Sequence, residues 1–463
     1  MIDGVIGGSR LVLEMAQLGG DRQINNNMGQ VIKVTGGTPL MGEVVPAPNK
    51  NSILACLPAC ILTDEDVYYH NVPRSTDVIK MLEMLKLLGA TIDDSDYNNI
   101  KINCAGLNSH KVDKELGSLI RASIMFAGPL LARFSVCEVP IPGGCVLGKR
   151  SISAHIDSFS KAGITTEFIE DGYVRFTAPK KVASNYFVWQ FEASVTGTEN
   201  FLMYCAGTES QVEIVSCACE PHVYELENLL ATMGAKVEGA GSNRVVVNGS
   251  RQLKGAHFTP GPDFVDIAGL CVASAITGGN IRIKGANIKR ISGGIVDTIK
   301  KFGVDITEVG EDLVVKGSGE LFIDLKEAGF PLAGDDLPKF VPKPWPGFPI
   351  DALPAIVVLA CKTNGRLLVQ NWMYETGLDY IRELSAMGAN IFMSDPQRII
   401  VSGPTKFKGG KITVPGIIEG AKAVFLASLC DDITTTIEGV EILKRRYTGI
   451  FDLYRRLGAD IVV

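Results

Sequence analysis

The sequence of 463 residues predicts an α/β protein of two domains, built from six repeated units of helices and strands. The first observation is a pattern in which an apolar helix-like segment ends at a glycine and runs into a strand-like segment. It recurs around Gly89, Gly163, Gly234, Gly303, Gly388 and Gly458, at spacings of 74, 71, 69, 85 and 70 residues. The second observation is the composition, 46% hydrophobic and 21% charged, which suits a globular chain of more than one domain. Six units group into two sets of three.

Within a unit, the segment before the glycine has helical periodicity and the segment after it has strand periodicity. Met81, Met84, Leu85 and Leu88 fall at the i, i+3 and i+4 positions of one helix face. Val304, Ile306 and Val309 follow Gly303 and are separated by polar residues. A glycine between two such segments fits the position just after a helix, where a positive φ costs little and the chain turns back into a strand.

The longest spacing, between the fourth and fifth glycines, contains a proline-rich segment. Its sequence over residues 337–354 is LPKFVPKPWPGFPIDALP, with five prolines from Pro338 to Pro349. Proline lacks a backbone N–H and does not fit a helix interior. We therefore expect an extended segment on the surface or in a cleft.

Charge and hydropathy exclude several classes of function. The net charge is −6 and the sequence pI is about 5.6, and Lys and Arg are spread along the chain, so no nucleic-acid-binding patch is indicated. No apolar run reaches the roughly 20 residues that cross a bilayer. The first residues, MIDGVIGGSRLVLEM, lack a basic leader region. We expect a cytoplasmic protein that binds neither nucleic acid nor membrane.

The 11 cysteines predict a reducing compartment and no metal site. Most lie in apolar segments such as residues 53–61, ILACLPACI, where a reduced cysteine packs as a small hydrophobic residue. Cys217 and Cys219 are separated by one residue instead of the two usual in zinc sites, and no second pair follows. The histidines are scattered. We expect no cofactor and no metal.

Cys145 differs from the other cysteines because it lies in a glycine-rich loop, PGGCVLGKR, over residues 142–150. Glycines let the backbone approach an anion closely, and Arg150 offers a fork of N–H groups for a phosphate or carboxylate. Nearby positive charge lowers the pKa of a thiol. The loop is compatible with a reactive cysteine and also with a structural one.

Two longer segments resemble a known family. LGSLIRASIMFAGPLLARFSVCEVPIPGGCVLGKR, over residues 116–150, and PNKNSILACLPACILTDEDVYYHNVPRSTDVIKMLEMLKLLGA, over residues 48–90, are similar to UDP-N-acetylglucosamine enolpyruvyl transferases. That group and the 5-enolpyruvylshikimate-3-phosphate synthases form the enolpyruvyl transferase family. The resemblance runs from about residue 30 to residue 463. It implies a two-domain inverted α/β barrel with the active site between the domains: residues 30–49 plus 260–463 form one domain, residues 50–259 form the other, and residues 1–29 are an N-terminal extension.

The resemblance also implies roles for single residues. Asp351 matches the base that takes the proton of the acceptor hydroxyl, and Cys145 matches the loop cysteine that delivers a proton to the donor. Lys50 matches a phosphate-binding catalytic lysine, and Glu375 matches the glutamate beside the reaction intermediate. The substrate-binding positions that it implies are Asn51, Arg121, Arg150, His155, Ser194, Val195, Asp263 and Arg445. The residue types suit these roles, since cations bind a phosphate leaving group and a carboxylate serves as a base.

Three positions depart from the family pattern. Gly377 and Glu419 stand where the family has two arginines that hold the carboxylate of phosphoenolpyruvate. Glu192 stands where the family has a cation near the diphosphate of the acceptor. Either the donor carboxylate is held elsewhere, for which Arg446, Lys444 and Lys422 are candidates, or the donor is not phosphoenolpyruvate.

The leading prediction is transfer of the enolpyruvyl group of phosphoenolpyruvate to a hydroxyl of a nucleotide or nucleotide-sugar-like acceptor, with release of phosphate. The first alternative keeps the fold but uses another phosphorylated donor, because of Gly377 and Glu419. The second alternative is a non-catalytic paralogue that binds a ligand. All three take small molecules as partners, and the sequence is compatible with a monomer or a homo-oligomer.

Overall fold

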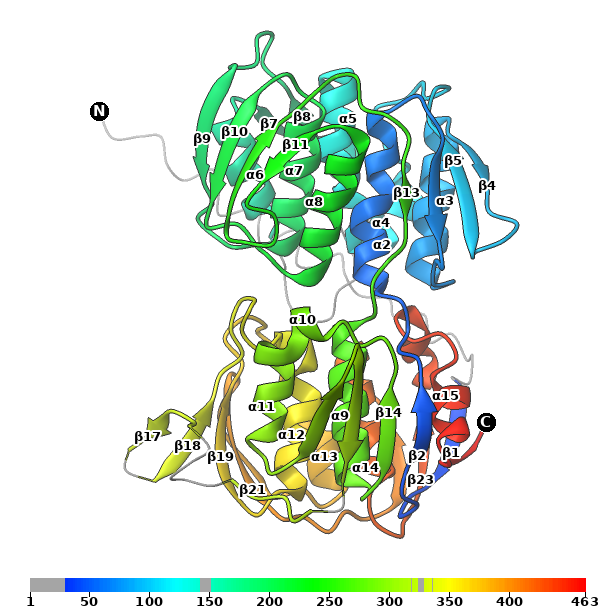
Figure 1. The fold of residues 1–463 in the computed structure, drawn as a ribbon, viewed down its shortest axis with the longest axis vertical. Coiled ribbons are helices and arrows are strands. Elements are labelled where there is room, and N and C mark those ends of the chain that lie inside the picture. Colours follow the sequence, from blue (N-terminus) through cyan, green and yellow to red (C-terminus); the bar gives the residue numbers. More distant parts are fainter. Residues whose placement is uncertain (1–29, 142–150, 318, 324–328, 335) are drawn as a thin grey trace.

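The structure is a computed structural model that describes residues 30–463 apart from 142–150, 318, 324–328 and 335. Figure 1 shows two lobes joined by a narrow waist, which we call the upper and lower lobes as they stand in that view. The buried core of the upper lobe draws its residues from Ile53 to Phe258. The core of the lower lobe draws on Ile32 to Val44 and on Phe264 to Ile461.

Each lobe has three sheets on its outside. Those of the upper lobe, in strand order, are β13 (His257–Phe258), β3 (Val67–His70), β5 (Asn99–Asn103) and β4 (Thr91–Asp93); then β6 (Val136–Pro140), β8 (Tyr173–Thr177) and β7 (Thr165–Ile169); then β11 (Lys236–Glu238), β12 (Arg244–Asn248), β10 (Gln211–Val215) and β9 (Asn185–Trp189).

The lower lobe repeats this arrangement with strands from both ends of the chain. Its sheets, in strand order, are β15 (Asp305–Val309), β16 (Asp312–Lys316), β14 (Asn280–Ile283) and β2 (Met41–Val44); then β17 (Leu332–Ala333), β18 (Leu337–Phe340), β19 (Gly365–Gln370), β21 (Arg398–Gly403) and β20 (Ile391–Asp395); then β22 (Gly410–Thr413), β23 (Thr434–Glu438), β1 (Val31–Thr35) and β24 (Asp460–Val462). The predicted extended segment of prolines begins in β18.

The predicted repeat is confirmed in the topology of the sheets. In each unit the strand after the glycine is antiparallel to a second strand, which is antiparallel to a third. In five units the third strand is parallel to a fourth. In the second unit a single parallel bridge between Lys111 and Glu138 takes the place of the fourth strand.

The six glycines have the backbone conformation that the sequence predicts. Their φ values are 107° at Gly89, 78° at Gly163, 117° at Gly234, 80° at Gly303, 95° at Gly388 and 101° at Gly458. Each lies one or two residues before the strand that follows it. A side chain with a Cβ rarely adopts this φ, so glycine reverses the chain there at little cost.

Helices fill the inside of each lobe. The α-helices are α2 (Lys50–Cys56), α3 (Thr76–Leu88), α4 (Lys114–Leu119), α5 (Ala127–Phe134), α6 (Ser153–Lys161), α7 (Val195–Ala206), α8 (Pro221–Met233), α9 (Phe264–Ile276), α10 (Ile288–Ile291), α11 (Asp297–Lys300), α12 (Leu353–Lys362), α13 (Ile381–Ala386), α14 (Ile418–Ser428) and α15 (Ile450–Arg456). Short 3-10 turns are η1 (Leu57–Leu62), η2 (Arg121–Phe126), η3 (Glu170–Gly172), η5 (Ile350–Ala352) and η6 (Val440–Arg445), and η4 (Ser292–Val296) is a π turn.

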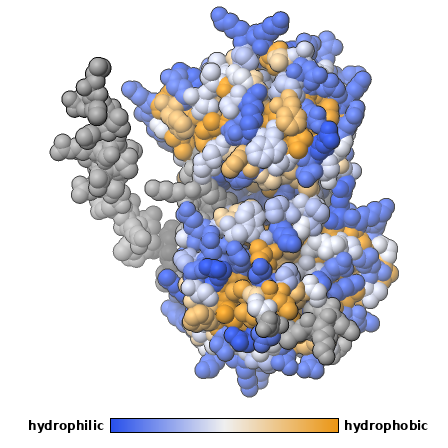
Figure 2. All heavy atoms as spheres, turned by 90° about the vertical axis from the view of Figure 1, so that its left-hand side faces the viewer, coloured by the Kyte–Doolittle hydropathy of each residue, from blue (hydrophilic) through white to orange (hydrophobic). Residues whose placement is uncertain are grey.

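The most deeply buried helices explain the long apolar runs in the sequence. Every residue of α9 is buried, and α12 packs against both α9 and α14 at the centre of the lower lobe. A helix enclosed on all sides has no polar face. None of the helices in the described part of the chain is both long and apolar enough to cross a membrane. Figure 2 shows hydrophilic residues over the outer ends of both lobes.

The chain passes between the lobes twice, and the two crossing segments lie side by side. Pro48 and Pro262 form an antiparallel bridge. The N–H of Asn49 donates to the carbonyl of Gly261, and the N–H of Asp263 donates to the carbonyl of Ala47, both at 2.8 Å. These bonds place the start of α2 next to the start of α9, so polar residues at both helix starts face the waist.

Candidate functional site

The first group of site residues joins the two lobes through one carboxylate. Lys50, the first residue of α2, places Nζ 2.9 Å from Oδ2 of Asp77 in the first turn of α3. Arg445 in η6 of the lower lobe places Nη2 3.5 Å from Oδ1 of the same side chain. Two cations around one carboxylate leave a net positive charge, which favours a bound phosphate. Lys50 and Arg445, two predicted site residues, are thereby brought together.

Asn49 fixes the start of α2. Its Oδ1 accepts from the backbone N–H groups of Asn51 and Ser52, the usual N-cap arrangement, and the residue is buried. Its Nδ2 is buried without a hydrogen-bond partner among the described residues. Asn51 is half-buried beside Lys50, so the predicted Lys-Asn pair lies at the waist.

The second group surrounds the buried guanidinium of Arg446. Nε and Nη2 donate to the two carboxylate oxygens of Asp263 at 2.8 and 3.0 Å. Nη1 lies 3.4 Å from Oδ2 of Asp351 and 3.3 Å from Oε1 of Glu419. Asp263 also caps α9 by accepting from the N–H groups of Val265 and Asp266. One cation therefore holds three carboxylates, from α9, η5 and α14.

Burial and charge act in opposite directions on this group. Burial by itself would raise the pKa of Asp263, but the Arg446 guanidinium holds that pKa below its usual value. Burial would lower the pKa of Arg446, but Asp263 raises it well above its usual value. Asp263 and Arg446 are thus an ionised pair. The sequence implied a binding role for Asp263, whereas its contacts in the described structure are with the protein itself.

Asp351 lies where both lobes can reach it. Its Oδ1 accepts from the hydroxyl of Tyr374 at 3.1 Å, and its Oδ2 faces Arg446. Its side chain is 30% exposed, so a ligand can contact it. Glu375, the neighbour of Tyr374, is exposed. In the described part of the chain the side chain that reaches Asp351 from this turn is that of Tyr374.

Gly377 and Glu419 lie together in the wall of a small pocket. The pocket has a volume of about 20 Å³, enough for about one water molecule. It is lined by Ile350, Asp351, Leu353, Pro354, Asn371, Tyr374, Gly377, Tyr380, Ile417, Glu419 and Gly420. A Cβ built on Gly377 would overlap Nδ2 of Asn371, so the amide of Asn371 fills the space of a side chain at position 377.

The cations proposed as substitutes for the missing arginines are mostly occupied. Arg446 is held by three carboxylates, as described above. Nζ of Lys422 lies 2.7 Å from Oδ1 of Asp266 and 4.0 Å from the centre of the Tyr447 ring, and both charged groups are buried. Lys444 is exposed. Neither buried cation is free to take a new anion without breaking an ion pair.

The predicted acceptor-binding residues gather in the upper lobe around the start of α7. Ser194 caps this helix, and its Oγ accepts from the N–H of Gly197 at 3.3 Å. His155 on α6 is buried between Thr196 and Asn200, at 3.2 and 3.0 Å. Burial and the nearby Arg121 lower the pKa of His155 to about 3, so the imidazole is neutral.

Val195 and Arg121 complete this group. Val195 is the half-buried first residue of α7. Nη2 of Arg121 donates to the carbonyl of Ser151 at 2.9 Å, which ties η2 to the segment before α6. Glu192 is exposed beside them. Five polar or half-buried positions from four chain segments thus form one face of the upper lobe.

Cys145 and Arg150 lie outside the described residues, so their predicted roles stay predictions. The ten other cysteines are all buried and form no disulfide in the described structure. Within the described ranges, His, Cys, Asp and Glu form no group of three or more that could hold a metal ion.

Two residues of the site were missed by sequence reasoning. Asp77 follows Ser75 in a helix-start pattern, which predicts a cap but not a contact with Lys50 or Arg445. Tyr374 precedes the predicted Glu375 and has no motif of its own. Their roles depend on contacts between residues far apart in the chain, which no local pattern encodes.

Comparisons with known proteins agree with this arrangement. The sequence model of the EPSP synthase family, 3-phosphoshikimate 1-carboxyvinyltransferase, matches residues 34–340. UDP-N-acetylglucosamine 1-carboxyvinyltransferase of Borrelia garinii is 34% identical over 428 residues, covering 92% of this chain and 97% of that protein. The enzyme of the same name from Bacteroides thetaiotaomicron is 30% identical over 440 residues, covering 92% and 98%.

Solved structures share the fold. The enolpyruvyl transferase NikO from Streptomyces tendae superimposes with a TM-score of 0.79 at 20% identity, covering 94% of this chain and 99% of that one. An EPSP synthase from Acinetobacter baumannii gives 0.70 at 18% identity, covering 94% and 100%. The fold class and the family resemblance predicted from the sequence are confirmed, and the chain belongs to the EPSP synthase family of enolpyruvyl (carboxyvinyl) transferases.

Proposed function

We propose that the protein transfers the enolpyruvyl group of phosphoenolpyruvate to a hydroxyl of a nucleotide-sugar-like acceptor and releases phosphate. The observation that carries the proposal is that Lys50 and Arg445, from different lobes, share Asp77 at the waist where Asp351 is also exposed. A phosphate can replace Asp77 as the partner of both cations. The names of the relatives, UDP-N-acetylglucosamine 1-carboxyvinyltransferases, support a nucleotide sugar as acceptor.

The residues divide the reaction between them. Asp351 takes the proton of the acceptor hydroxyl while its oxygen bonds to the carbon that carries the donor phosphate, and Cys145 supplies a proton to the neighbouring carbon. Phosphate then leaves that carbon toward Lys50, Arg445 and Arg150 as a proton is lost from the neighbouring carbon, which restores the double bond. Glu375 stabilises the intermediate. His155, Ser194, Val195, Asn51 and Arg121 bind the acceptor.

The two lobes would act as domains, residues 50–259 and residues 30–49 with 260–463. Their closure would exclude water from the waist and bring the cations of both lobes to one phosphate. The crossing segments around Pro48 and Pro262 are the positions at which such a rotation can occur.

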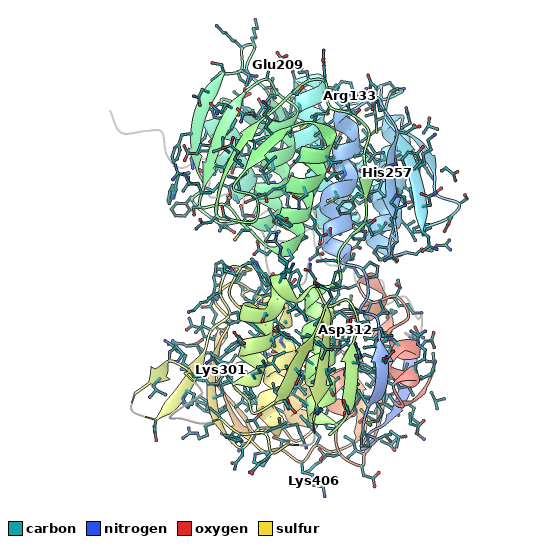
Figure 3. The ribbon with its side chains drawn as sticks, viewed as in Figure 1. Arg133, Glu209, His257, Lys301, Asp312 and Lys406 are labelled. Atoms are coloured by element: carbon teal, nitrogen blue, oxygen red, sulfur yellow. The ribbon has the colours of Figure 1, made fainter. Side chains whose placement is uncertain are left out.

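A phosphate-release assay with phosphoenolpyruvate and a panel of nucleotides and sugar nucleotides tests the proposal. We expect turnover with at least one acceptor and a loss of about 100-fold or more in Asp351→Asn and Cys145→Ser. Lys406→Ala, on the outer end of the lower lobe (Figure 3), is a control that should keep full activity. No turnover with any acceptor, or full activity in Asp351→Asn, would contradict the proposal.

A second candidate is transfer from another phosphorylated donor. It is favoured by the acidic wall at Glu419 and by the ion pairs that occupy Arg446 and Lys422. Calorimetric titration distinguishes the two. Tight binding of phosphoenolpyruvate supports the first candidate, whereas absent binding beside tight binding of a different phosphate ester supports the second.

A further inference from the structure

Glu419 is placed so that its carboxyl group reaches both the pocket and the buried guanidinium. It lies in the first turn of α14, its Oε1 is 3.3 Å from Nη1 of Arg446, and its side chain is 16% exposed. It lines the pocket together with Asp351 and Gly377. The same Nη1 lies 3.4 Å from Asp351, so the two carboxyl groups share one N–H-bearing nitrogen.

The charges of this region do not balance when every carboxyl group is ionised. The side chains involved are three cations, Lys50, Arg445 and Arg446, and four carboxylates, Asp77, Asp263, Asp351 and Glu419. A donor carboxylate would add a further negative charge in a partly buried place. Two ionised carboxylates in contact repel, whereas a carboxyl group and a carboxylate that share a proton attract.

The donor carboxylate has to lie near Glu419 if the proposed function holds, and the inference rests on that function. In phosphoenolpyruvate the phosphate oxygen and the carboxylate are attached to the same carbon. With the phosphate between Lys50 and Arg445 and the acceptor hydroxyl at Asp351, that carbon lies beside the wall that Asp351 and Glu419 form. The positive charge of Lys50 also acts on Glu419, which confirms that the two groups are neighbours.

We infer that Glu419 binds the carboxylate of the donor as a neutral hydrogen-bond donor, with Arg446 supplying the positive charge behind it. A carboxylic acid kept protonated in a partly apolar site is a strong hydrogen-bond donor to an oxyanion. Arg446 cannot take this role directly because Asp263 occupies Nε and Nη2. Glu419 thus acts where its relatives in the family carry an arginine, and it selects the donor at a pH at which it keeps its proton.

The local environment favours the protonated form. Burial and the negative charge of Asp351 raise the pKa of Glu419, while Arg446 and Lys50 oppose this rise. The titratable and charged groups that face Glu419 or its Arg446 partner are Asp351, Arg446, Lys50, Tyr447, Asp263 and Tyr374. Of these, Asp351 is the carboxylate that lines the pocket with Glu419.

The test is calorimetric titration of the full-length protein with phosphoenolpyruvate and with glycerol 3-phosphate, a phosphate ester without a carboxylate, from about pH 5.5 to about pH 9. We expect the affinity for phosphoenolpyruvate, divided by that for glycerol 3-phosphate, to fall about tenfold per pH unit above the pKa of Glu419. The ratio removes the ionisation of the phosphate itself.

Two variants separate hydrogen bonding from charge. Glu419→Gln keeps an N–H donor and has no proton to lose, so the ratio should stay within about threefold of the low-pH value at every pH. Glu419→Ala should lower the ratio about tenfold at low pH. Glu209→Gln, at the outer end of the upper lobe (Figure 3), is the matched control and should behave as the unchanged protein.

An unchanged pH dependence in Glu419→Gln, or a ratio in the unchanged protein that is the same at every pH, would overturn the inference. The second measurement needs no variant and so does not depend on how a variant folds. Binding is read without turnover. A lack of phosphate release with phosphoenolpyruvate would count against the proposed function, while the pH titration separately decides the role of Glu419.

Discussion

Nη1 of Arg446 lies 3.3 Å from Oε1 of Glu419, and the same guanidinium binds Asp263 through its other two nitrogens. The residue is only 3% exposed. A family site that uses arginines to hold a donor has here one internal arginine surrounded by acidic side chains. Stability, pH response and ligand choice all depend on this arrangement.

Removing the guanidinium should destabilise the lower lobe strongly. Arg446→Met leaves Asp263, Asp351 and Glu419 without their shared cation, and breaking a buried pair costs about 3–5 kcal/mol. Urea denaturation at neutral pH measures the loss. Lys406→Ala, on the outer end of the lobe (Figure 3), should change stability by less than about 0.5 kcal/mol. A loss in Arg446→Met as small as that of the control would contradict the structure.

Lys50 should matter far more for phosphate than for folding. Lys50→Ala removes one of the two cations around Asp77, and we expect phosphate release to fall about 100-fold. Calorimetry with inorganic phosphate should show weaker binding in the same variant. Equal phosphate affinity in Lys50→Ala and the unchanged protein would show that the anion binds elsewhere.

Glu199 is a buried carboxyl group whose removal should stabilise the protein. Its Oε1 has no hydrogen-bond partner among the described residues, and burial, with the nearby Glu220, raises its pKa well above the usual value. A carboxyl group with a raised folded-state pKa costs nothing below its unfolded pKa of about 4.3, and it costs stability increasingly as the pH rises from there to the folded pKa.

Glu199→Gln should therefore increase the free energy of unfolding by about 1 kcal/mol or more at pH 8 and change it little near pH 4. Urea denaturation at both pH values measures the difference. Glu209→Gln, an exposed control in the same lobe, should show no such pH dependence. A gain of the same size at both pH values would mean that the effect is not due to ionisation of Glu199.

Gly377 should tolerate a side chain only when Asn371 is shortened. A Cβ at position 377 overlaps the amide of Asn371, so Gly377→Ala should cost about 1–3 kcal/mol through overpacking. In the double variant with Asn371→Ala the clash disappears, and its cost should be smaller than the sum of the two single costs. Strict additivity in this double-mutant cycle would contradict the packing described for the pocket.

The six units were predictable from the sequence because their signals are local. Helical periodicity before Gly89 and alternation after Gly303 depend on neighbours within a few residues, and so does the positive φ at both glycines. Such patterns can be read without knowing where the rest of the chain lies. The family resemblance then supplied candidate positions such as Lys50, Asp351 and Arg445.

The contacts of those positions were decided by the tertiary structure. Arg446 and Asp263 are 183 residues apart in the chain, and the lobes have to fold and meet before they can pair. Asp77 binds cations from both lobes for the same reason. The sequence alone determines the repeated unit, its glycine turns and the family, because these follow from local chemistry and overall similarity. Which charges are free and which are already paired is decided only in the folded chain, because burial and long-range packing set the electrostatics of the site.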